Sequence, residues 1–505
     1  MWIKSKKNKE NKEELTTITK GAGVFVFGYA IELVIGFVIT FVLIKFLGAG
    51  DFGIYSLGLV VLGIGSVIAR LGLNNGALKY VSVYIGAGKK EKAKGIIVQS
   101  ILFSFVSGII FGIFIYFFSG IIATLFNKPA LESIIKIIVF GIPFLSVLLV
   151  LGAISRGFKT TKYEALGVRV IKPLANFILI LIFYALGFCI LGMAWAIVVA
   201  IIFATLISLY FIIKIFPELL SKKIIPKFET KKLLLTSLPL MMIGVLFFLI
   251  HWTDVLMVGY FMPEESVGIY RVVIQIAAFV AISLEAFNSI FAPLISDLYH
   301  KGEKKNLSSL FKTVTRWGFS LSFLVFLIII FSCDEILSIF GKDFISGAGS
   351  LLILSLGQLI NVAVGGVGFM LMMTGREKLE SLNTAVVLIL NIILNLILIP
   401  KLGILGAALA TAISISVINI IRVIEVYLKL KMHPFNRKFL KSIAAGSLAF
   451  LATLLLKSYI STDSYIASLA ISSFSIFTVF ILFLLIFKLE KEDRFILKKI
   501  KQKLL

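Results

Sequence analysis

The feature that most constrains the fold of this 505-residue chain is a succession of long apolar segments. A helix needs about 20 apolar residues, each rising about 1.5 Å, to cross the hydrocarbon of a bilayer. By this measure we predict fourteen spans, which begin near Gly21, Gly53, Ile96, Ile134, Val168, Leu191, Ser237, Gly268, Trp317, Ser350, Leu382, Ile404, Phe439 and Tyr465. The mean hydropathy of +1.07 and the charged fraction of 15% agree, because a soluble domain has about a quarter of its residues charged. We therefore expect an all-α polytopic membrane protein.

A layout of six spans occurs twice, about 214 residues apart. Its landmarks are Gly53-Ile54-Tyr55 with Gly268-Ile269-Tyr270, Tyr84 and Lys89-Lys90 with Tyr299 and Lys304-Lys305, Phe126-x-Lys128 with Phe340-x-Lys342, and Leu191-Gly192-x-Ala194 with Leu405-Gly406-x-Ala408. Six is an even number, so both repeats enter the membrane from the same side. We predict that a pseudo-two-fold axis along the membrane normal relates them, with a cleft on that axis, an arrangement typical of secondary transporters.

The predicted organisation follows from the spans and from the basic residues. It comprises an amino-terminal tail (1–20), a first half (21–214), a linker (215–236), a second half (237–428), two extra helices (439–487) and a basic carboxyl-terminal tail (488–505). Of the 50 Lys and Arg residues, 42 lie in the tails and in every second connection, and 7 lie in the opposite connections. Because basic loops resist translocation, we predict that both tails are cytoplasmic.

The basic residues behind the net charge of +24 then set the orientation of the chain in the membrane. They also contact anionic lipid head groups. We expect no nucleic-acid partner. The segment from Gly86 to Lys90 lacks the spacing of a phosphate-binding loop, and the three histidines form no metal-binding or catalytic pattern. We expect neither an enzyme nor direct use of ATP.

Cys189 and Cys333 fall near the same predicted outer face. The sequence therefore allows either a disulfide between them or two free thiols.

Arg70 is the most informative charged residue inside a predicted span. An ionisable side chain there costs about 2.5 to 3.5 kcal/mol on insertion scales, so it calls for a partner or a water-filled face. Its repeat-equivalent is Glu285 (285 − 70 = 215). One hypothesis is that the two residues face each other across the axis; the other is that each pairs locally or snorkels to the interface.

Two carboxylates are candidates for coupling to protons or sodium ions. Glu32 lies near the middle of the first span, and the alternative is a protonated group bonded to a neighbouring helix. Asp254 shares a helix face with His251, three positions earlier. The alternative for Asp254 is an ion pair with Arg271 that closes the hairpin.

The remaining polar residues are divided by their position. The candidate substrate-binding set comprises Arg70, Asn74, Lys79, Lys172, His251 and Glu285. Five basic residues lie at the predicted cytoplasmic mouth of the first half. They are either solvated interface charges or an entry funnel for a phosphate head group: Lys79, Arg156, Lys159, Arg169 and Lys172. Asn391, Asn395, Gln358 and Asn361 are expected to form hydrogen bonds between helices.

Two stretches carry a resemblance to a known family. Residues 46–55 (FLGAGDFGIY), followed by residues 70–73 (RLGL), resemble the opening of polysaccharide-biosynthesis flippases in the multidrug/oligosaccharidyl-lipid/polysaccharide exporter superfamily. Residues 253–259 (TDVLMVG), with residues 267–270 (VGIY), resemble the start of that family's second half. The resemblance covers essentially the whole chain.

This resemblance implies that the chain moves a polyprenyl-diphosphate-linked oligosaccharide from the cytoplasmic to the outer leaflet by alternating access. We further expect a monomer in the cell membrane, with no cofactor unless Na⁺ or H⁺ serves as coupling ion. Arg70 suits the diphosphate because its guanidinium fork binds phosphate bidentately. An organic-cation antiporter of the same superfamily would instead use Glu32, Asp254 and Glu285. A third hypothesis, a polytopic glycosyltransferase or ligase, would need a carboxylate on the outer loop at 333–349.

Overall fold

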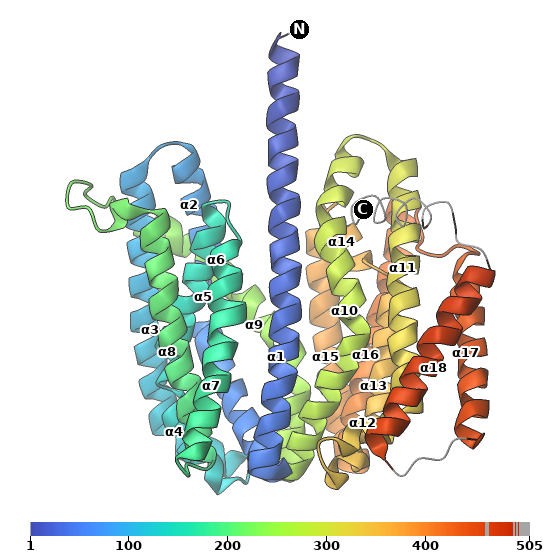
Figure 1. The fold of residues 1–505 in the computed structure, drawn as a ribbon. Coiled ribbons are helices and arrows are strands. Elements are labelled where there is room, and N and C mark those ends of the chain that lie inside the picture. Colours follow the sequence, from blue (N-terminus) through green and yellow to red (C-terminus); the bar gives the residue numbers. More distant parts are fainter. Residues whose placement is uncertain (1, 460–463, 488–489, 491–492, 494–505) are drawn as a thin grey trace. The chain divides into compact units, whose positions relative to one another are not determined.

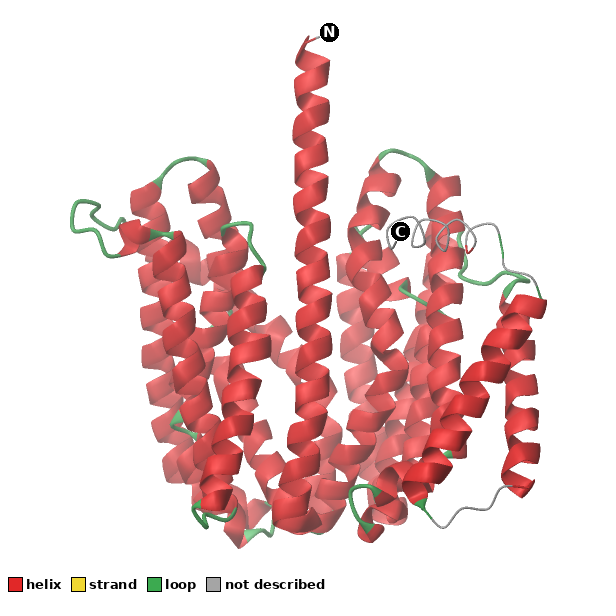
Figure 2. Cartoon of the chain, viewed as in Figure 1, coloured by secondary structure: helices red, strands yellow, loops and turns green. Residues whose placement is uncertain are grey.

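The computed structural model describes residues 2–459, 464–487, 490 and 493. The chain divides into two compact units, Met1–Gly268 (unit 1) and Ile269–Leu505 (unit 2). Helices and the loops and turns that connect them make up the described residues, and no strand occurs among them (Figure 2). The predicted all-α polytopic fold is therefore confirmed, in keeping with the need of backbone groups in a bilayer to bond within their own segment.

Unit 1 contains the helices of the first repeat and one more (Figure 1). In chain order they are α1 (Trp2–Ala69), α2 (Leu73–Gly86), α3 (Lys90–Leu125), α4 (Pro129–Ile138), α5 (Gly141–Gly157), α6 (Lys162–Glu164), the π-helix η1 (Ala165–Ile171), α7 (Lys172–Ala185), α8 (Ile190–Ile215), the 3-10 helix η2 (Pro217–Leu219) and α9 (Thr230–Phe261). The helix α10 (Glu264–His300) begins at the end of this unit and continues into the next.

Unit 2 holds the rest of α10 and the remaining helices (Figure 1). These are α11 (Lys304–Phe331), α12 (Cys333–Ser338), the 3-10 helix η3 (Lys342–Gly347), α13 (Ala348–Ala363), α14 (Val367–Met372), α15 (Glu377–Leu402), α16 (Ile404–Leu430), α17 (Phe439–Tyr459) and α18 (Tyr465–Ile486).

The helices agree closely with the predicted spans. Every predicted start lies inside a helix. Within the described residues, twelve helices are long and apolar enough to cross a membrane, or thirteen if the bent pair α4 and α5 is one span. The chain is thus a multi-pass membrane protein, while the number fourteen and the axis between the repeats stay predictions.

The long helix α1 is interrupted at Gly48. Its φ of 74° and ψ of −178° are not helical, and residues other than glycine rarely adopt a positive φ. Before this residue, Phe46 stacks on Tyr184 of α7; after it, Gly63 packs against Phe248 of α9. Gly48 therefore separates two arms with different neighbours, so α1 is counted once although it contains two predicted spans.

The first landmark of the repeat lies at a close crossing of helix ends inside unit 1. A Cβ atom at Gly53 would lie 1.9 Å from the carbonyl oxygen of Glu264, and one at Gly268 would lie 2.1 Å from that of Ala49. Both pairs of equivalent residues are 215 positions apart (268 − 53 and 264 − 49). The contact is therefore reciprocal, and it requires glycine at both landmark positions because no larger residue fits.

The helix α9 packs within unit 1, although the predicted second half begins at Ser237. The Lys128 ammonium donates to the carbonyl oxygens of Gly259 and Met262, each at 2.8 Å. At the other end of the helix, the Tyr80 and Thr236 hydroxyls are hydrogen-bonded at 2.7 Å. Helix packing and sequence repetition thus divide the chain at different places, and the predicted repeat boundaries stay a prediction.

The two extra helices, α17 and α18, pack on α11. Their contact is an apolar cluster that includes Leu324, Leu327, Ala445, Ile476 and Phe480. Glu335 of α12 fastens the hairpin, because it accepts hydrogen bonds from Lys457 at 2.7 Å and from Ser468 at 2.9 Å.

Candidate functional site

A helix break positions Arg70 in unit 1. The helix α1 ends at Ala69, and both Leu71 (φ 50°) and Gly72 (φ 69°) have left-handed backbones before α2 begins. A Cβ atom at Gly72 would lie 2.0 Å from the carbonyl oxygen of Ser237 in α9. Both the backbone angle and the neighbouring helix therefore demand glycine, and broken helices of this kind mark binding sites in many transporters.

The Arg70 guanidinium keeps most of its hydrogen-bonding capacity. Its Nε donates to the Ser66 carbonyl oxygen at 3.2 Å. Within the described part of the chain, its two Nη groups have no hydrogen-bond partner and no carboxylate in ion-pair contact. The side chain is half-buried. A planar fork with its terminal donors unengaged suits the bidentate binding of a phosphate.

Glu32, the predicted ion-coupling carboxylate, forms an ion pair with Arg169. The Glu32 Oε2 and Arg169 Nη1 atoms are 2.7 Å apart, and the two side chains are 32% and 18% exposed. Arg169 lies on the π-helix η1, and π-helical turns are frequent at functional sites. Glu32 is therefore not an isolated charge but half of a pair that joins α1 to η1.

The other predicted site residues of unit 1 lie along α2, α7 and α9. Asn74 and Lys172 are half-buried and Asp254 is buried. The exposed Lys79 lies over the Tyr80 ring, 5.5 Å from its centre. His251 is exposed, and its Nδ1 donates to the Phe247 carbonyl oxygen at 2.8 Å. Their roles stay predictions.

Glu285 is exposed on α10 in unit 2. Arg70 and Glu285 belong to different units, so their pairing across the predicted axis also stays a prediction.

A second polar site, in unit 2, was not predicted. Arg422 of α16 binds the Glu380 carboxylate of α15 through Nε at 3.0 Å and through Nη2. The Asn383 amide donates to Glu425 Oε2 at 2.6 Å. The signal in the sequence is the matched spacing of three positions on each helix, which brings both pairs to one interface.

The expected hydrogen bonds between helices are confirmed for two residues. Asn391 of α15 bonds to Thr411 of α16 at 3.2 Å, and Asn361 of α13 accepts from Asn419 of α16 at 2.9 Å. The Asn395 amide also donates to Asn391 Oδ1, on the same helix, at 3.0 Å. These hydrogen bonds join helices in a region poor in water, so we interpret them as structural contacts and not as substrate contacts.

The connection between the repeats is held against the end of α3. Lys90 pairs with Glu218 at 2.6 Å, and the Lys94 ammonium donates to the Ser221 carbonyl oxygen at 2.7 Å. Glu229 receives hydrogen bonds from Lys92 and from the Tyr84 hydroxyl. These two donors lower the pKa of Glu229 to about 2.

Two solved structures share this architecture. Lipid II flippase MurJ, in an inward closed conformation, is 17% identical with a TM-score of 0.69, and the match covers 93% of this chain and 98% of that one. An inward-facing MATE family transporter is 17% identical with a TM-score of 0.64, covering 82% and 98%. The chain is therefore a polytopic membrane protein with the fold that MATE transporters and MurJ share.

The sequence comparisons identify the family. The polysaccharide biosynthesis protein family matches residues 18–299, more than half of the chain, and the MatE family matches residues 239–400. The chain belongs to the polysaccharide biosynthesis protein family. The resemblance seen in the sequence is therefore confirmed.

Two proteins of known sequence are similar to this chain. A probable low-salt glycan biosynthesis flippase of Haloferax volcanii is 30% identical over 167 residues, 33% of this chain and 35% of that protein. The chain thus matches about a third of that relative's length. An uncharacterized membrane protein of Methanocaldococcus jannaschii is 26% identical over 427 residues, 78% of this chain and 81% of that one.

Proposed function

We propose that this protein is a flippase that moves a polyprenyl-diphosphate-linked oligosaccharide from the inner to the outer leaflet by alternating access. The observation that carries the proposal is Arg70, whose terminal donors are unengaged at a break between two helices. A diphosphate head group needs cationic donors in a low-dielectric site, and a guanidinium fork supplies two parallel hydrogen bonds. The family match and the flippase relative support the same cargo.

The organic-cation antiporter is the second candidate, because the MatE family matches residues 239–400. That function would need carboxylates free to hold a cation. Glu32 already faces Arg169 at 2.7 Å, which neutralises much of its field. The pairing therefore favours the lipid-diphosphate cargo over a cation.

The glycosyltransferase or ligase hypothesis has the least support. Among the carboxylates of the outer loop, Glu335 binds Lys457 and Ser468 and so fastens the terminal hairpin. A transport protein rather than an enzyme is the reading that the family and the relative support. The proposal includes a monomer in the cell membrane that contacts membrane lipids and has both termini in the cytoplasm. Its coupling ion, where one is used, is Na⁺ or H⁺.

Reconstitution tests the proposal directly. The purified protein, placed in vesicles that carry a fluorescent polyprenyl-diphosphate-linked oligosaccharide, should speed the appearance of the label in the opposite leaflet, as read by a membrane-impermeant quencher. Vesicles without protein and vesicles with a fluorescent organic cation are the controls. Cation exchange without movement of the lipid would overturn the proposal in favour of the antiporter.

A further inference from the structure

Unit 2 contains a helix break of its own, inside the candidate span Lys342–Met372. The helix α13 ends at Ala363 and α14 begins at Val367, and Gly365 between them has a left-handed backbone, with a φ of 67°. The last carbonyl groups of a helix have no partner within it, and they carry the negative end of its dipole. The break therefore places a partly negative helix end inside the span.

Two side-chain oxygens lie against the glycines of this break. A Cβ atom at Gly365 would lie 2.1 Å from Thr315 Oγ1 of α11, and one at Gly366 would lie 2.5 Å from Asn288 Oδ1 of α10. Both polar side chains are buried, with 2% of Thr315 and 5% of Asn288 exposed. The space that a side chain would take at the break is therefore bordered by oxygen atoms from two other helices.

The two oxygens can still accept an electropositive ligand. Asn288 Oδ1 is buried and has no hydrogen-bond partner among the described residues. Thr315 donates its hydroxyl proton to the Phe311 carbonyl oxygen at 2.8 Å, which leaves the lone pairs of its own oxygen to face a ligand. A buried acceptor without a partner costs free energy, so a group that meets Asn288 Oδ1 would recover that cost.

The chemistry of these ligands fits an alkali-metal ion. Both side chains offer neutral oxygens, and the part of the chain that the structure describes has no group of three His, Cys, Asp or Glu residues able to hold a metal. Divalent ions such as Ca²⁺ are bound largely by carboxylates. Monovalent ions are held by carbonyl and hydroxyl oxygens, and in transporters by the carboxyl-terminal ends of broken helices.

We propose that the break between α13 and α14 binds a sodium or potassium ion, with Asn288 Oδ1 and Thr315 Oγ1 as its side-chain ligands. Carbonyl oxygens at the end of α13 supply the remaining ligands. The site belongs to unit 2, whereas Arg70 and Glu32 belong to unit 1. Ion binding can be measured without a glycan cargo, so this proposal can fail while the proposed function stands, and the reverse.

Thermal unfolding of the purified full-length protein in NaCl, KCl or choline chloride tests the proposal. A ligand that binds only the folded state raises the melting temperature as its concentration rises. At least one of the two alkali salts should therefore raise the melting temperature above that in choline chloride at equal ionic strength. The more effective salt identifies the ion.

Asn288→Leu separates ion binding from a structural role of this residue. Leucine is of similar size and lacks the buried oxygen, so the variant should melt at or above the parent in choline chloride. It should melt below the parent in the effective alkali salt, because the response to the ion is lost. A residue with a structural role alone would shift the melting temperature equally in all three salts.

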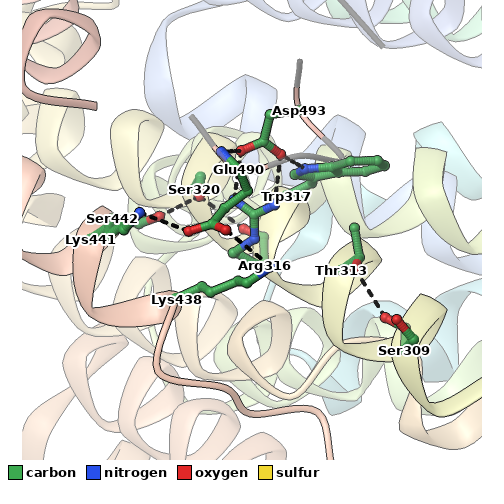
Figure 3. Close-up of polar contacts among 10 residues, drawn as sticks. All are labelled: Ser309, Thr313, Arg316, Trp317, Ser320, Lys438, Lys441, Ser442, Glu490 and Asp493. Atoms are coloured by element: carbon green, nitrogen blue, oxygen red, sulfur yellow. Dashed lines mark hydrogen bonds and ion pairs between the residues drawn. The ribbon is translucent and has the colours of Figure 1, made fainter. Parts of the chain in front are cut away.

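Thr315→Val and Thr313→Val form a matched pair of variants on α11. Each hydroxyl donates to the carbonyl oxygen four residues earlier, at 2.8 Å for Thr315 and at 3.0 Å for Thr313 (Figure 3). The two residues lie about 200° apart around the helix, so Thr313 is directed away from the break. Thr315→Val should need at least about tenfold more of the alkali salt for the same stabilisation, and Thr313→Val should respond as the parent does.

Two results would overturn the proposal. One is a parent protein with the same melting temperature in all three salts. The other is a full response to the alkali salt in either Asn288→Leu or Thr315→Val. Either result would leave water as the partner of Asn288.

Discussion

Arg70 and Glu32 are both charged residues in predicted spans, yet they have opposite surroundings. Glu32 has a guanidinium at 2.7 Å, whereas the terminal donors of Arg70 have no partner within the described residues. A paired charge stabilises helix packing, and an unengaged one costs free energy until a ligand or water meets it. The two residues therefore call for different experiments.

Replacing Arg70 should impair transport more than folding. We expect Arg70→Ala to lower the rate of lipid-linked glycan transport about tenfold to a hundredfold, the value of one or two charge-assisted hydrogen bonds. Arg70→Lys should recover only part of the activity because it lacks the fork. Outer-surface glycan and vesicle transport are the measurements, and Lys223→Ala, at an exposed lysine of the linker, is the control. Full transport by Arg70→Ala would exclude a role in binding the diphosphate.

Breaking the Glu32–Arg169 pair should destabilise unit 1 through the charge that is left behind. We expect Glu32→Gln and Arg169→Gln each to lower the free energy of unfolding by about 1 to 3 kcal/mol, and the double variant to lose less than the sum. The loss should be smaller than for a fully buried pair because Glu32 is 32% exposed and water screens the charge that remains. Thermal unfolding of the purified proteins measures it, and additive losses would contradict a direct interaction.

The ion-coupling hypothesis for Glu32 predicts a second effect of Glu32→Gln. The variant should transport without responding to an imposed proton or sodium gradient. A response equal to that of the parent would place the coupling site elsewhere, with Asp254 and Glu285 the next carboxylates to replace.

At the scale of elements, breaks in helices do more than the helices themselves to position the candidate site. Gly72 allows α1 to end beside α9, and this break is where Arg70 lies. The end of α9 is in turn held by Glu229, whose contacts come from α2 and α3. Both features can be tested by single substitutions.

A side chain at Gly72 should disturb both the break and the contact with α9. We expect Gly72→Ala to cost more than about 1 kcal/mol of stability, because its φ is positive and its Cβ would lie 2.0 Å from a carbonyl oxygen. Gly86→Ala is the matched control, since nothing lies within 4 Å of a Cβ there. Equal melting temperatures of the two variants would show that the break tolerates a side chain.

The Glu229 contacts should stabilise unit 1 in a way that depends on pH. Because the folded state lowers the pKa of Glu229 from 4.5 to about 2, this contribution is fully present above about pH 4.5 and is lost as the pH falls towards 2. Glu229→Gln should therefore lower the melting temperature at pH 7 and differ less from the parent at pH 3. Glu91→Gln, at an exposed carboxylate nearby, should show no such pattern, and a constant difference at both pH values would contradict the assignment.

At the scale of the whole molecule, hydropathy and repetition predicted the class of fold because a bilayer leaves few alternatives. Arg70 could be chosen from its depth in an apolar segment. Its surroundings could not, because the break depends on the approach of Ser237, far along the chain. Likewise, the partner of Glu32 lies 137 residues away on a π-helical turn that no local sequence pattern predicts. The contact of Glu380 with Arg422 depends on which helices pack together, and single residues do not indicate this.

The orientation of the chain can be tested with its own cysteines. Both are free in the structure, Cys189 exposed and Cys333 buried. In whole cells, a membrane-impermeant maleimide should label Cys189, because the basic residues predict that this turn faces outward. In a Cys189→Ser background, K223C in the linker should be labelled only after the cells are opened. The reverse pattern would invert the predicted topology.

The reciprocal contact of Gly53 and Gly268 bears on the ancestry of the protein. When two identical subunits meet across a two-fold axis, residue i of one touches residue j of the other, and j touches i in return. Ala49 with Gly268 and Gly53 with Glu264 follow this rule between equivalent positions of one chain. Such a pattern is what remains when the gene for a homodimer of six-helix subunits is duplicated and fused. The crossing would then be older than the fusion, and a six-helix ancestor rebuilt from one repeat should dimerise through this glycine.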